Sequence, residues 1–470
     1  MNSMTITKDV TASADVLRSI NPASGEEIER FEIAGAAAID AALDAVARAS
    51  LGWRRTRVDQ RATLLRAAAA ALRRNQESHA ATITAEMGKP VTEARAEIEK
   101  CAFACDHFAD HAEQHMADEP APSDSPASFI AYEPLGTVLA CMPWNFPYWQ
   151  VFRCAAPALA AGNCVVLKHA GNVTRCGLRI AEVFREAGFP ESVFRTLVVR
   201  HDAVAELIAD QRITAVSLTG STGAGRSVAT TAGAHVKKCV LELGGSDAFI
   251  VLDDADVDAA AATGARSRFQ NAGQSCISAK RFIVAESVAD GFEERLVEHA
   301  RAIRVGEPTE DTTQMGPMAR ADLRDNLERQ MNDSVAGGAV LAYGGARLDR
   351  PGFFFEPTVI THCTVDMAAF TEETFGPLAA VTRVKDDAEA IEVANHSEYG
   401  LGGNVWTTDR DRGLHVARQC MSGGVFVNGM THSDPRLPFG GIRESGYGRE
   451  LHRFGMHEFV NVKTIWVPPA

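Results

Sequence analysis

The spacing of apolar residues divides the chain into a helical first part and a longer part in which short strands alternate with helices. Alanine-rich stretches at 36–80 and 92–115 carry apolar and polar residues at helical spacing, which predicts amphipathic helices. From about residue 135, apolar runs of strand length alternate with helix-type segments such as 174–188. The strand candidates of this series are 135–142, 164–168, 195–199, 214–220 and 238–245.

Apolar strands joined by helical crossovers predict an α/β fold with a parallel sheet covered on both faces. That is the architecture of a dinucleotide-binding domain. A second α/β series runs from 248–256 through 424–429, and a glycine-rich stretch at 437–450 leads to a last strand candidate at 460–467. The Pro-, Ser- and acid-rich segment 118–127 is typical of an exposed connector. We expect two α/β lobes with the site between them.

Composition narrows the class of protein. A chain of 470 residues, 46% hydrophobic and 23% charged, is expected to form two or three soluble globular domains. The net charge of −14, without a basic block, argues against nucleic acid as a partner. We expect no membrane span, because no apolar run reaches 18 residues, and residues 1–13 do not read as a secretory signal. Ten cysteines without a CxxC pair favour a reducing compartment, which we expect to be the cytoplasm.

Three residues are candidates for catalysis. Cys276 follows a Gly-Gln-Ser turn, where a thiolate nucleophile has room for a substrate, although a cysteine alone is more often a packing residue. Glu242 ends a strand candidate before two glycines, as a general base or as an ordinary salt-bridged acid. Asn145 lies between Pro143 and Pro147, in a turn that either fixes its amide as an oxyanion donor or is only an apolar turn.

Two further segments are candidates for ligand binding, and a third group of residues only imitates a metal site. The segment 217–226 runs from a strand through a glycine-rich turn into a helix, an arrangement that can hold a pyrophosphate, although it is not a clean GxGxxG. Lys168 ends a strand candidate, where a lysine is more often a solvated edge residue. The residues His107, His111 and His115 share one helical face, but no carboxylate or cysteine completes the set, so we expect no metal site.

Together these segments resemble the aldehyde dehydrogenase superfamily over nearly the whole chain. Its motifs occur in the family's order: PWNFP (143–147), Lys168, TGSTGAG (219–225), LELGG (241–245), GQSC (273–276), EETFGP (372–377) and PFGG (438–441). The resemblance implies an aldehyde dehydrogenase-like fold assembled as a homodimer or homotetramer. The implied parts are a Rossmann-type cofactor domain at 1–116 and 135–244, an α/β catalytic domain at 245–446, and a small β oligomerisation element at 117–134 and 447–470.

The resemblance also assigns roles to single residues. It implies that Cys276 is the nucleophile, that Glu242 activates water, and that Asn145 with the backbone N–H of Cys276 forms the oxyanion hole. An aldehyde would then be oxidised to a carboxylic acid through a thioester. The implied cofactor contacts are Trp144, Asn145, Lys168, His169, Ala170, Gly171, Gly220, Ser221, Leu243, Glu373 and Phe375.

The substrate and the cofactor are narrowed by closer matches. The segments PWNFPYWQVFR, LKHAGN and KKCVLELGGSD are similar to the bacterial succinate-semialdehyde dehydrogenase branch, with glutarate semialdehyde or another aliphatic semialdehyde as the alternative substrate. Arg153 matches a position that holds the distal carboxylate, and a structural ion pair is the alternative. Gln270 stands where some of these enzymes have a second arginine, for which Arg436 is a candidate substitute. Gly171 stands where NAD-preferring members often have Glu, which favours NADP over NAD.

Two other classes of function stay open at this point. One is a non-catalytic protein that keeps the fold, since fold alone does not prove activity. The other is a thioester hydrolase that uses the same Cys and Glu without redox chemistry. The joint presence of Cys276, Glu242, Asn145 and Lys168 argues against the first, and absorbance at 340 nm formed from NAD(P) and an aldehyde would exclude the second.

Overall fold

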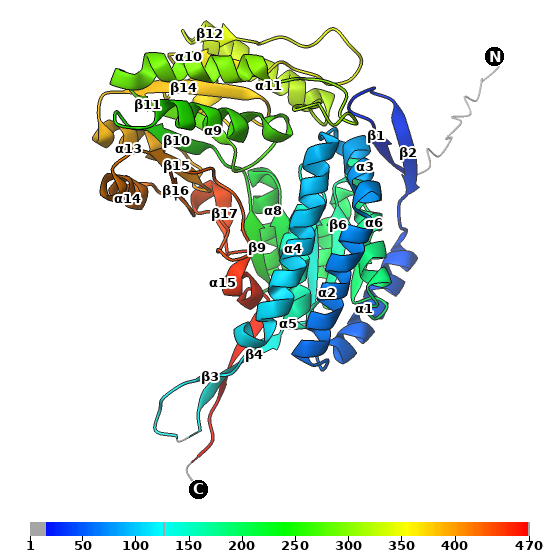
Figure 1. The fold of residues 1–470 in the computed structure, drawn as a ribbon. Coiled ribbons are helices and arrows are strands. Elements are labelled where there is room, and N and C mark those ends of the chain that lie inside the picture. The colour runs from blue at the N-terminus through cyan, green and yellow to red at the C-terminus, as the bar shows by residue number, and fades with distance from the viewer. Residues whose placement is uncertain (1–15, 126, 469–470) are drawn as a thin grey trace, which may run out of the picture.

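The computed structural model describes residues 16–125 and 127–468, so the N-terminal segment assessed above as a possible signal lies outside the described residues. Figure 1 shows two α/β lobes side by side, with a narrow β extension that leaves the first lobe and ends near the C-terminus. Within the described ranges, no helix is both long and apolar enough to cross a membrane.

The first lobe is built on a six-stranded sheet in the order β17-β9-β8-β5-β6-β7. The strands from β5 to β9 are parallel, and the short β17 pairs antiparallel with β9. The chain runs outward from β5 to β7 and returns to β8 on the other side of β5, which creates the switch point where dinucleotides bind. The strands are β5 (Thr137–Met142), β6 (Cys164–His169), β7 (Phe194–Thr196), β8 (Ala215–Thr219), β9 (Lys238–Glu242) and β17 (Gly446–Tyr447).

Helices cover this sheet because its central strands are buried on both faces; every residue of β5 is buried. Helix α5 packs on β5 and β6, and α2 and α4 pack over α5, so that α5 is buried along its whole length (Figure 1). The predicted helical stretches are present as α1 to α4, and an N-terminal hairpin of β1 and β2 lies against residues 171–173. The elements are β1 (Val16–Ile20), β2 (Glu27–Glu32), α1 (Ala36–Trp53), α2 (Val58–Arg74), α3 (Gln76–Met87), α4 (Val91–His115), α5 (Trp149–Ala161), α6 (Thr174–Glu186), α7 (Val204–Ala209) and α8 (Thr222–Ala234).

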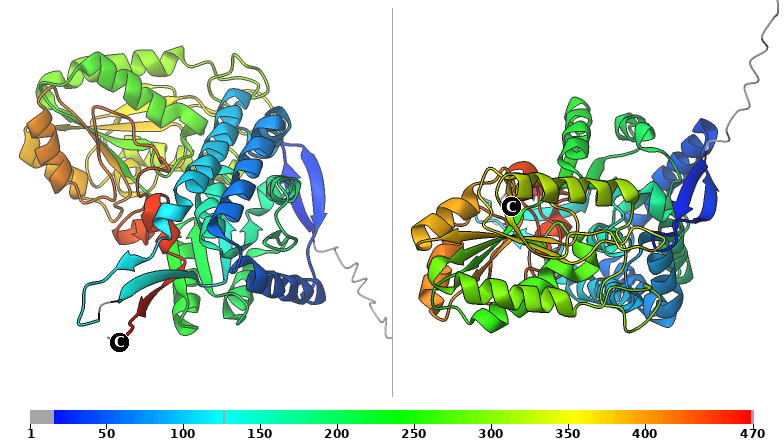
Figure 2. Two further views of the ribbon diagram at one scale, coloured as in Figure 1. Left: turned by 60° about the horizontal axis from the view of Figure 1, so that its bottom comes forward. Right: turned by 90° about the horizontal axis from the view of Figure 1, so that it is seen from above.

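The second lobe has a seven-stranded sheet in the order β12-β13-β14-β11-β10-β15-β16, parallel except for β12. Figure 2 shows its helices on either side of the sheet. The strands are β10 (Asp247–Val251), β11 (Ala279–Ala285), β12 (Val340–Tyr343), β13 (Thr358–Thr361), β14 (Leu378–Val384), β15 (Gly403–Trp406) and β16 (Phe426–Val427). The helices are α9 (Val257–Phe269), α10 (Glu286–Ala302), α11 (Ala321–Ala336), α12 (Ala368–Thr371), α13 (Asp387–Asn395) and α14 (Arg410–Gln419).

The extension is a three-stranded antiparallel sheet in the order β18-β4-β3 (Figures 1 and 2). Strand β3 (Glu119–Pro120) pairs with β4 (Phe129–Pro134), and β18 (Val460–Ile465) pairs along the whole of β4. Of the segment 447–470 that we assigned to this element, β18 joins it, whereas Tyr447 pairs with β9 and α15 (His452–His457) packs on α5. The chain therefore returns to the first lobe before it enters the extension, a long-range pairing that local sequence pattern does not reveal.

Candidate active site

The side chains singled out in the first lobe lie at or just after the carboxyl ends of neighbouring parallel strands. Asn145 follows β5, Lys168 lies near the end of β6, Ser221 follows β8, and Glu242 ends β9. The carboxyl ends of parallel strands meet at one edge of a sheet, so these residues share the edge from which the chain passes into β10 of the second lobe.

The loop before Cys276 has an unusual backbone. After α9, Asn271, Ala272 and Gly273 all adopt positive φ angles of 55°, 51° and 71°. Two of the three are not glycine, and such conformations persist only where the surroundings hold them. Gly273 is also packed so closely that a Cβ atom there would lie 2.2 Å from the carbonyl oxygen of Gly376. The loop is thus fixed by its contacts rather than by its local preference.

Asn271 supplies several of these contacts. Its backbone N–H donates to Glu93 Oε2 (3.0 Å), and its side-chain Nδ2 donates to the carbonyl oxygens of Asn145 (2.8 Å) and Gln274 (3.1 Å). The buried Asn145 donates its own Nδ2 to the same Gln274 carbonyl at 3.1 Å. The amide therefore lies beside the loop that carries Cys276, which suits a donor to an oxyanion formed there.

The surroundings of Cys276 disfavour its thiolate form. Burial raises its pKa to about 11, and the charges of Glu373 and Glu242 add to the rise, while Arg153 and Lys280 oppose it. Nucleophilic attack by Cys276 therefore requires either a base that accepts the thiol proton or a fall in the pKa of the thiol when ligands occupy the site.

Lys280 ties the nucleophile to the second lobe and was missed by the sequence reasoning. Its fully buried Nζ donates to the carbonyl oxygens of Gly245 (2.6 Å) and Cys276 (2.8 Å), and lies 3.3 Å from Glu373 Oε1. The available signal was a basic residue in a short run that ends in apolar residues, since Lys280 is the second residue of the buried strand β11. A cation placed there orients both the Cys276 backbone and the Glu373 carboxylate.

Glu242 is an almost wholly buried carboxyl group, 2% exposed, and neither of its oxygens has a hydrogen-bond partner among the described residues. Burial raises its pKa, Arg153 opposes the rise, and Glu450 adds to it. An unsatisfied buried carboxyl at a strand end is suited to receive a water molecule and its proton.

Arg153 has its counter-ion inside the protein. The guanidinium, 1% exposed, forms an ion pair with the equally buried Glu450, donates to Thr219 Oγ1 at 3.1 Å, and lies 4.5 Å from the centre of the Phe439 ring. The ion-pair alternative is therefore present, although Arg153 also lines the cavity at Cys276. Arg436 does not line that cavity: its side chain is 66% exposed and paired with Asp434, because the chain turns it outward before the PFGG segment.

A cavity of about 140 Å³ opens at the nucleophile. Its wall includes Cys276, Arg153, Lys100, Trp149, Gln270 and Ser433. Two walls come from α4 and α5 of the first lobe, and the others come from the Cys276 loop and residues 430–433. The volume suits a small molecule of a few carbons.

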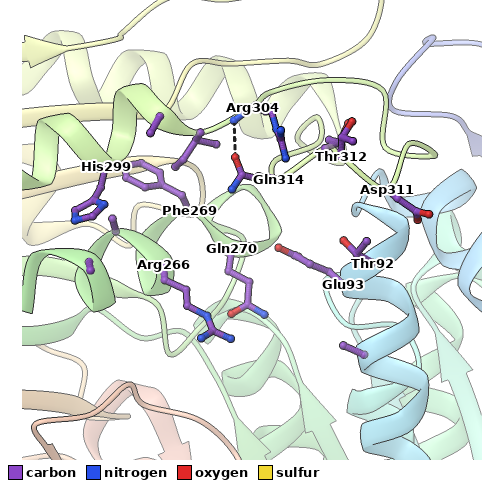
Figure 3. Close-up of a pocket in the computed structure, with 16 residues that line it drawn as sticks. Thr92, Glu93, Arg266, Phe269, Gln270, His299, Arg304, Asp311, Thr312 and Gln314 are labelled. Atoms are coloured by element: carbon purple, nitrogen blue, oxygen red, sulfur yellow. Dashed lines mark hydrogen bonds between the residues drawn. The ribbon is translucent and has the colours of Figure 1, made fainter. Parts of the chain in front are cut away.

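A second and larger cavity of about 610 Å³ lies between α4, α9 and α10 (Figure 3). Glu93, Arg266 and Gln270 project toward it, and Cys276 does not line it (Figure 3). Gln270 borders both cavities, so the two adjoin at this side chain. The larger cavity thus lies behind the nucleophile loop, on the side where Glu93 accepts from Asn271.

The edge of the first sheet fits a dinucleotide. Lys168 has no hydrogen-bond or ion-pair partner among the described residues, and burial lowers the pKa of its ammonium group. Both properties are expected of a lysine whose counter-ion is a bound anion. Ser221 caps α8 by accepting from the backbone N–H of Ala224 at 3.3 Å. Helix α8 packs directly on Leu243, because a Cβ atom at Gly225 would lie 2.4 Å from Leu243 Cδ1. A close helix, a free lysine and an exposed helix start are the donors that a phosphate chain needs.

The opposite end of that groove is formed by Glu373, Phe375 and Trp144. Glu373 Oε1 accepts from the backbone N–H of Gly245 at 3.0 Å, and a Cβ atom on Gly244 would lie 2.6 Å from its Oε2. The rings of Trp144 and Phe375 meet edge to face, with centroids 5.6 Å apart. A carboxylate and an aromatic wall suit a ribose and a nicotinamide ring.

The side chain of His169, which follows Lys168, is not placed to make the cofactor contact that the resemblance implies. Its imidazole is buried, lies 2.8 Å from the carbonyl oxygen of Pro147, and accepts from the N–H of Ala170 at 2.9 Å. The ring points inward because β6 alternates its side chains, so the imidazole is not open to a cofactor. Gly171 lies against Leu17 of β1, with 3.4 Å between its Cβ position and Leu17 Cδ2.

The histidines of α4 pack against one another rather than around a common point. The rings of His107 and His111 stack at 4.3 Å, and those of His111 and His115 at 5.8 Å. Burial lowers the pKa of His107 and of His115 to about 4. Among the residues that the structure places, no three His, Cys, Asp or Glu side chains are arranged to hold a metal ion.

Comparison with known proteins gives one consistent answer. The model of the aldehyde dehydrogenase family matches residues 10–465. The NAD(P)+-dependent succinate semialdehyde dehydrogenase Sad of Escherichia coli K12 is 48% identical over 95% of this chain and 97% of its own, and a probable NADP+-dependent succinate-semialdehyde dehydrogenase of Synechocystis is 48% identical over 96% and 99%. A crystal structure of succinic semialdehyde dehydrogenase from Streptococcus pyogenes with NADP+ superposes with a TM-score of 0.94 at 38% identity, covering 96% of this chain and all of the other.

Proposed function

The chain belongs to the aldehyde dehydrogenase family, and from that premise we propose that it oxidises succinate semialdehyde to succinate with NADP or NAD as the electron acceptor. The observation that carries the proposal is the small cavity that the Cys276 thiol and two cationic side chains line together. The names of the similar enzymes from Escherichia coli and Synechocystis support the same substrate.

The residues of the chain support a thioester mechanism. The Cys276 thiol first loses its proton to water, and the resulting thiolate adds to the aldehyde carbon. The amide of Asn145 with the backbone N–H of Cys276 stabilises the oxyanion that forms. NADP or NAD, when bound, would supply the hydride acceptor that this oxidation needs. Glu242 then takes a proton from a water molecule, which attacks the thioester carbon. The C–S bond breaks, the acid leaves, and the proton on Glu242 passes to the Cys276 sulfur, which restores the thiol.

The cofactor would lie along the edge of the first sheet. Lys168 and the start of α8 at Ser221 would hold the adenosine and pyrophosphate end, and Glu373 the nicotinamide ribose, with the rings of Trp144 and Phe375 beside the nicotinamide. Gly171 places no carboxylate near Lys168, which supports NADP as the preferred cofactor. The similar structure from Streptococcus pyogenes was determined with NADP+.

The extension supports a homodimer or homotetramer. It projects from the first lobe, and Val462, Trp466 and Val467 expose between 45% and 60% of their surface. Its outer strands β18 and β3 have one unpaired edge each, which a second copy could extend. The ten free cysteines support a reducing compartment, which we propose to be the cytoplasm.

The proposal is tested by kcat/KM for succinate semialdehyde and for butanal, each with NADP and with NAD, followed at 340 nm. We expect the semialdehyde to be preferred by about 10²-fold, which corresponds to about 2.7 kcal/mol of selective binding in the transition state. Equal rates on the two aldehydes would leave the family assignment intact and remove the semialdehyde. Finding no turnover of any aldehyde would favour the non-catalytic alternative.

A further inference from the structure

The carboxylate of Glu93 reaches the nucleophile loop, residues 270–276, from the other lobe. Glu93 lies in the first turn of α4, and its Oε2 accepts from the backbone N–H of Asn271 at 3.0 Å. Within the described ranges this N–H is the only hydrogen-bond donor to Glu93, and no cation lies within ion-pair distance of it. The nearby Lys89 is paired with Glu97 instead. The position of Glu93 is therefore not explained by an ion pair.

The residue that Glu93 holds has a strained backbone. Asn271 has a φ of 55° and Ala272 a φ of 51°, conformations in which residues other than glycine persist only where their contacts hold them. The N–H of Asn271 is the donor at the start of this pair, and its acceptor comes from outside the loop. Loss of that acceptor would allow the pair to relax toward more common backbone conformations.

Asn271 in turn fixes the position of the Asn145 amide. Its Nδ2 donates to the carbonyl oxygens of Asn145 at 2.8 Å and of Gln274 at 3.1 Å, and Asn145 Nδ2 donates to the same Gln274 carbonyl at 3.1 Å. An amide nitrogen carries two hydrogens, so one holds the Asn145 amide against the loop and the second is left for an oxyanion. Asn145 and Cys276 are thus held relative to each other through Asn271.

We propose that Glu93 is a positioning residue for the oxidation: its ionised carboxylate holds the N–H of Asn271, and Asn271 keeps the Asn145 amide in place beside Cys276. The inference rests on the thioester mechanism proposed above, but it does not depend on which aldehyde is the substrate. Glu93 does not line the cavity at Cys276, so it does not touch the aldehyde. It should therefore act on the rate at which bound aldehyde reacts and not on aldehyde binding.

The surroundings of Glu93 make its charge sensitive to pH near neutrality. Burial raises the pKa of Glu93 to about 7, and the charge of Glu97 adds to the rise. Lys89, the N–H of Asn271 and Arg266 oppose the rise. The other titratable side chains that line the same cavity are His299, Arg304 and the ion-paired Asp311 (Figure 3). Because a carboxylate accepts hydrogen bonds more strongly than a neutral carboxyl group, the hold on Asn271 should tighten as the pH rises through about 7.

The first experiment measures kcat and KM for butanal and for succinate semialdehyde at pH 8. We expect kcat for both aldehydes to fall about 10- to 100-fold in Glu93→Ala and about two- to fivefold in Glu93→Gln, which keeps a neutral acceptor. KM should stay within about threefold of wild type, because the contact acts on the oxyanion and not on aldehyde binding.

Glu99→Ala is the matched control for Glu93→Ala. It removes another carboxylate of α4, one that is paired with Arg73 on α2 and does not contact the loop. Its kcat should stay within about twofold of wild type. A wild-type kcat in a folded Glu93→Ala enzyme would overturn the proposal.

The second experiment separates the charge of Glu93 from a merely structural role. The ratio of kcat in Glu93→Gln to kcat in wild type is measured from pH 6 to pH 9, so that titrations shared by the two enzymes cancel. We expect the ratio to be close to one at pH 6, where Glu93 is largely protonated, and to fall to a lower plateau above pH 8. A ratio that does not change with pH would overturn the proposal, also where Glu93→Ala does not fold.

The third experiment tests whether Glu93 acts through Asn145. Asn145→Ala alone should lower kcat about 10²- to 10³-fold. Adding Glu93→Ala should cost less than about threefold more, because the amide that Glu93 positions is already gone. Losses that multiply in the double variant would overturn the proposal. A wild-type kcat in Asn145→Ala would remove the oxyanion role of Asn145 together with the proposal, whereas a loss in Asn145→Ala without one in Glu93→Ala would remove the positioning role alone.

Discussion

Replacing Arg153 by Met is expected to destabilise the first lobe strongly. The change keeps the unbranched inner part of the side chain. It removes the guanidinium over the Phe439 ring and leaves Glu450 and Glu242, each at most 3% exposed, without their shared cation. Removing one partner of a buried ion pair typically costs about 3–5 kcal/mol. For a lobe of this size, each kcal/mol lowers Tm by about 2–4 °C, so we expect a fall of about 6–20 °C.

The pair is tested by a double-mutant cycle. Glu450→Gln alone should cost less, because Arg153 keeps Glu242 as a counter-charge, and the double variant should recover much of the loss, since no unpaired charge is then created at position 153 or 450. Tm is measured by differential scanning fluorimetry at fixed pH and protein concentration. A fall below 2 °C for Arg153→Met, or a double variant with the summed loss of the two single ones, would refute a structural pair.

The same variant separates the two roles that the sequence left open for Arg153. A structural arginine should lower turnover of succinate semialdehyde and butanal by similar factors. It should also move the pH dependence of deacylation upward, because loss of Arg153 raises the pKa of Glu242, which must be ionised to act as a base. A stable Arg153→Met enzyme that loses only the semialdehyde would instead make Arg153 a substrate residue.

Three further outcomes follow from the site. Glu242→Gln should accumulate acyl-enzyme, visible by intact mass, and lower steady-state turnover by at least about 10²-fold; rapid deacylation would remove Glu242 from its role. In cofactor-free enzyme, the rate at which iodoacetamide alkylates Cys276 is measured on the peptide that contains it. This rate should rise about tenfold per pH unit from pH 7 to pH 9, because the pKa of the thiol is raised to about 11. A plateau of the rate below pH 8 would contradict a neutral resting thiol. Gly171→Glu should lower the ratio of kcat/KM with NADP to kcat/KM with NAD about tenfold. Gly171→Ala, which adds only a Cβ atom that fits beside Leu17, should leave this ratio unchanged. An unchanged ratio in both variants would show that position 171 does not determine cofactor choice.

The parts of the molecule that sequence predicts well are those with a local signal. The helices predicted at 36–80 and 92–115 are present, and so are the strand before Asn145 and the strands that end at or near Lys168 and Glu242. They could be predicted because amphipathic spacing and buried apolar runs are properties of neighbouring residues. Comparison with the family confirms the fold, the enzyme class and NAD(P) as the cofactor type.

The parts that sequence does not predict depend on distant contacts. Nothing near Arg153 reveals Glu450, which arrives from the segment that returns to β9. Lys100 reads as one more polar residue of a helix, and only packing places it at the cavity of Cys276. The inward turn of His169 likewise depends on the carbonyl oxygen of Pro147 in another loop.

The backbone of the nucleophile loop has a consequence for motion. Gly273 meets Gly376 main chain to main chain, and a Cβ atom on Gly245 would lie 2.5 Å from the carbonyl oxygen of Cys276. Because these main-chain segments are in direct contact, one cannot shift unless the other shifts too. We therefore expect the loop of Cys276 and the segments packed on it to move together. We expect amide hydrogen exchange to be slow throughout this loop. We also expect the passage of small molecules between the two cavities to depend on the Gln270 side chain, which borders both. Side-chain rotations take picoseconds to nanoseconds, whereas the closure of a lid takes microseconds to milliseconds.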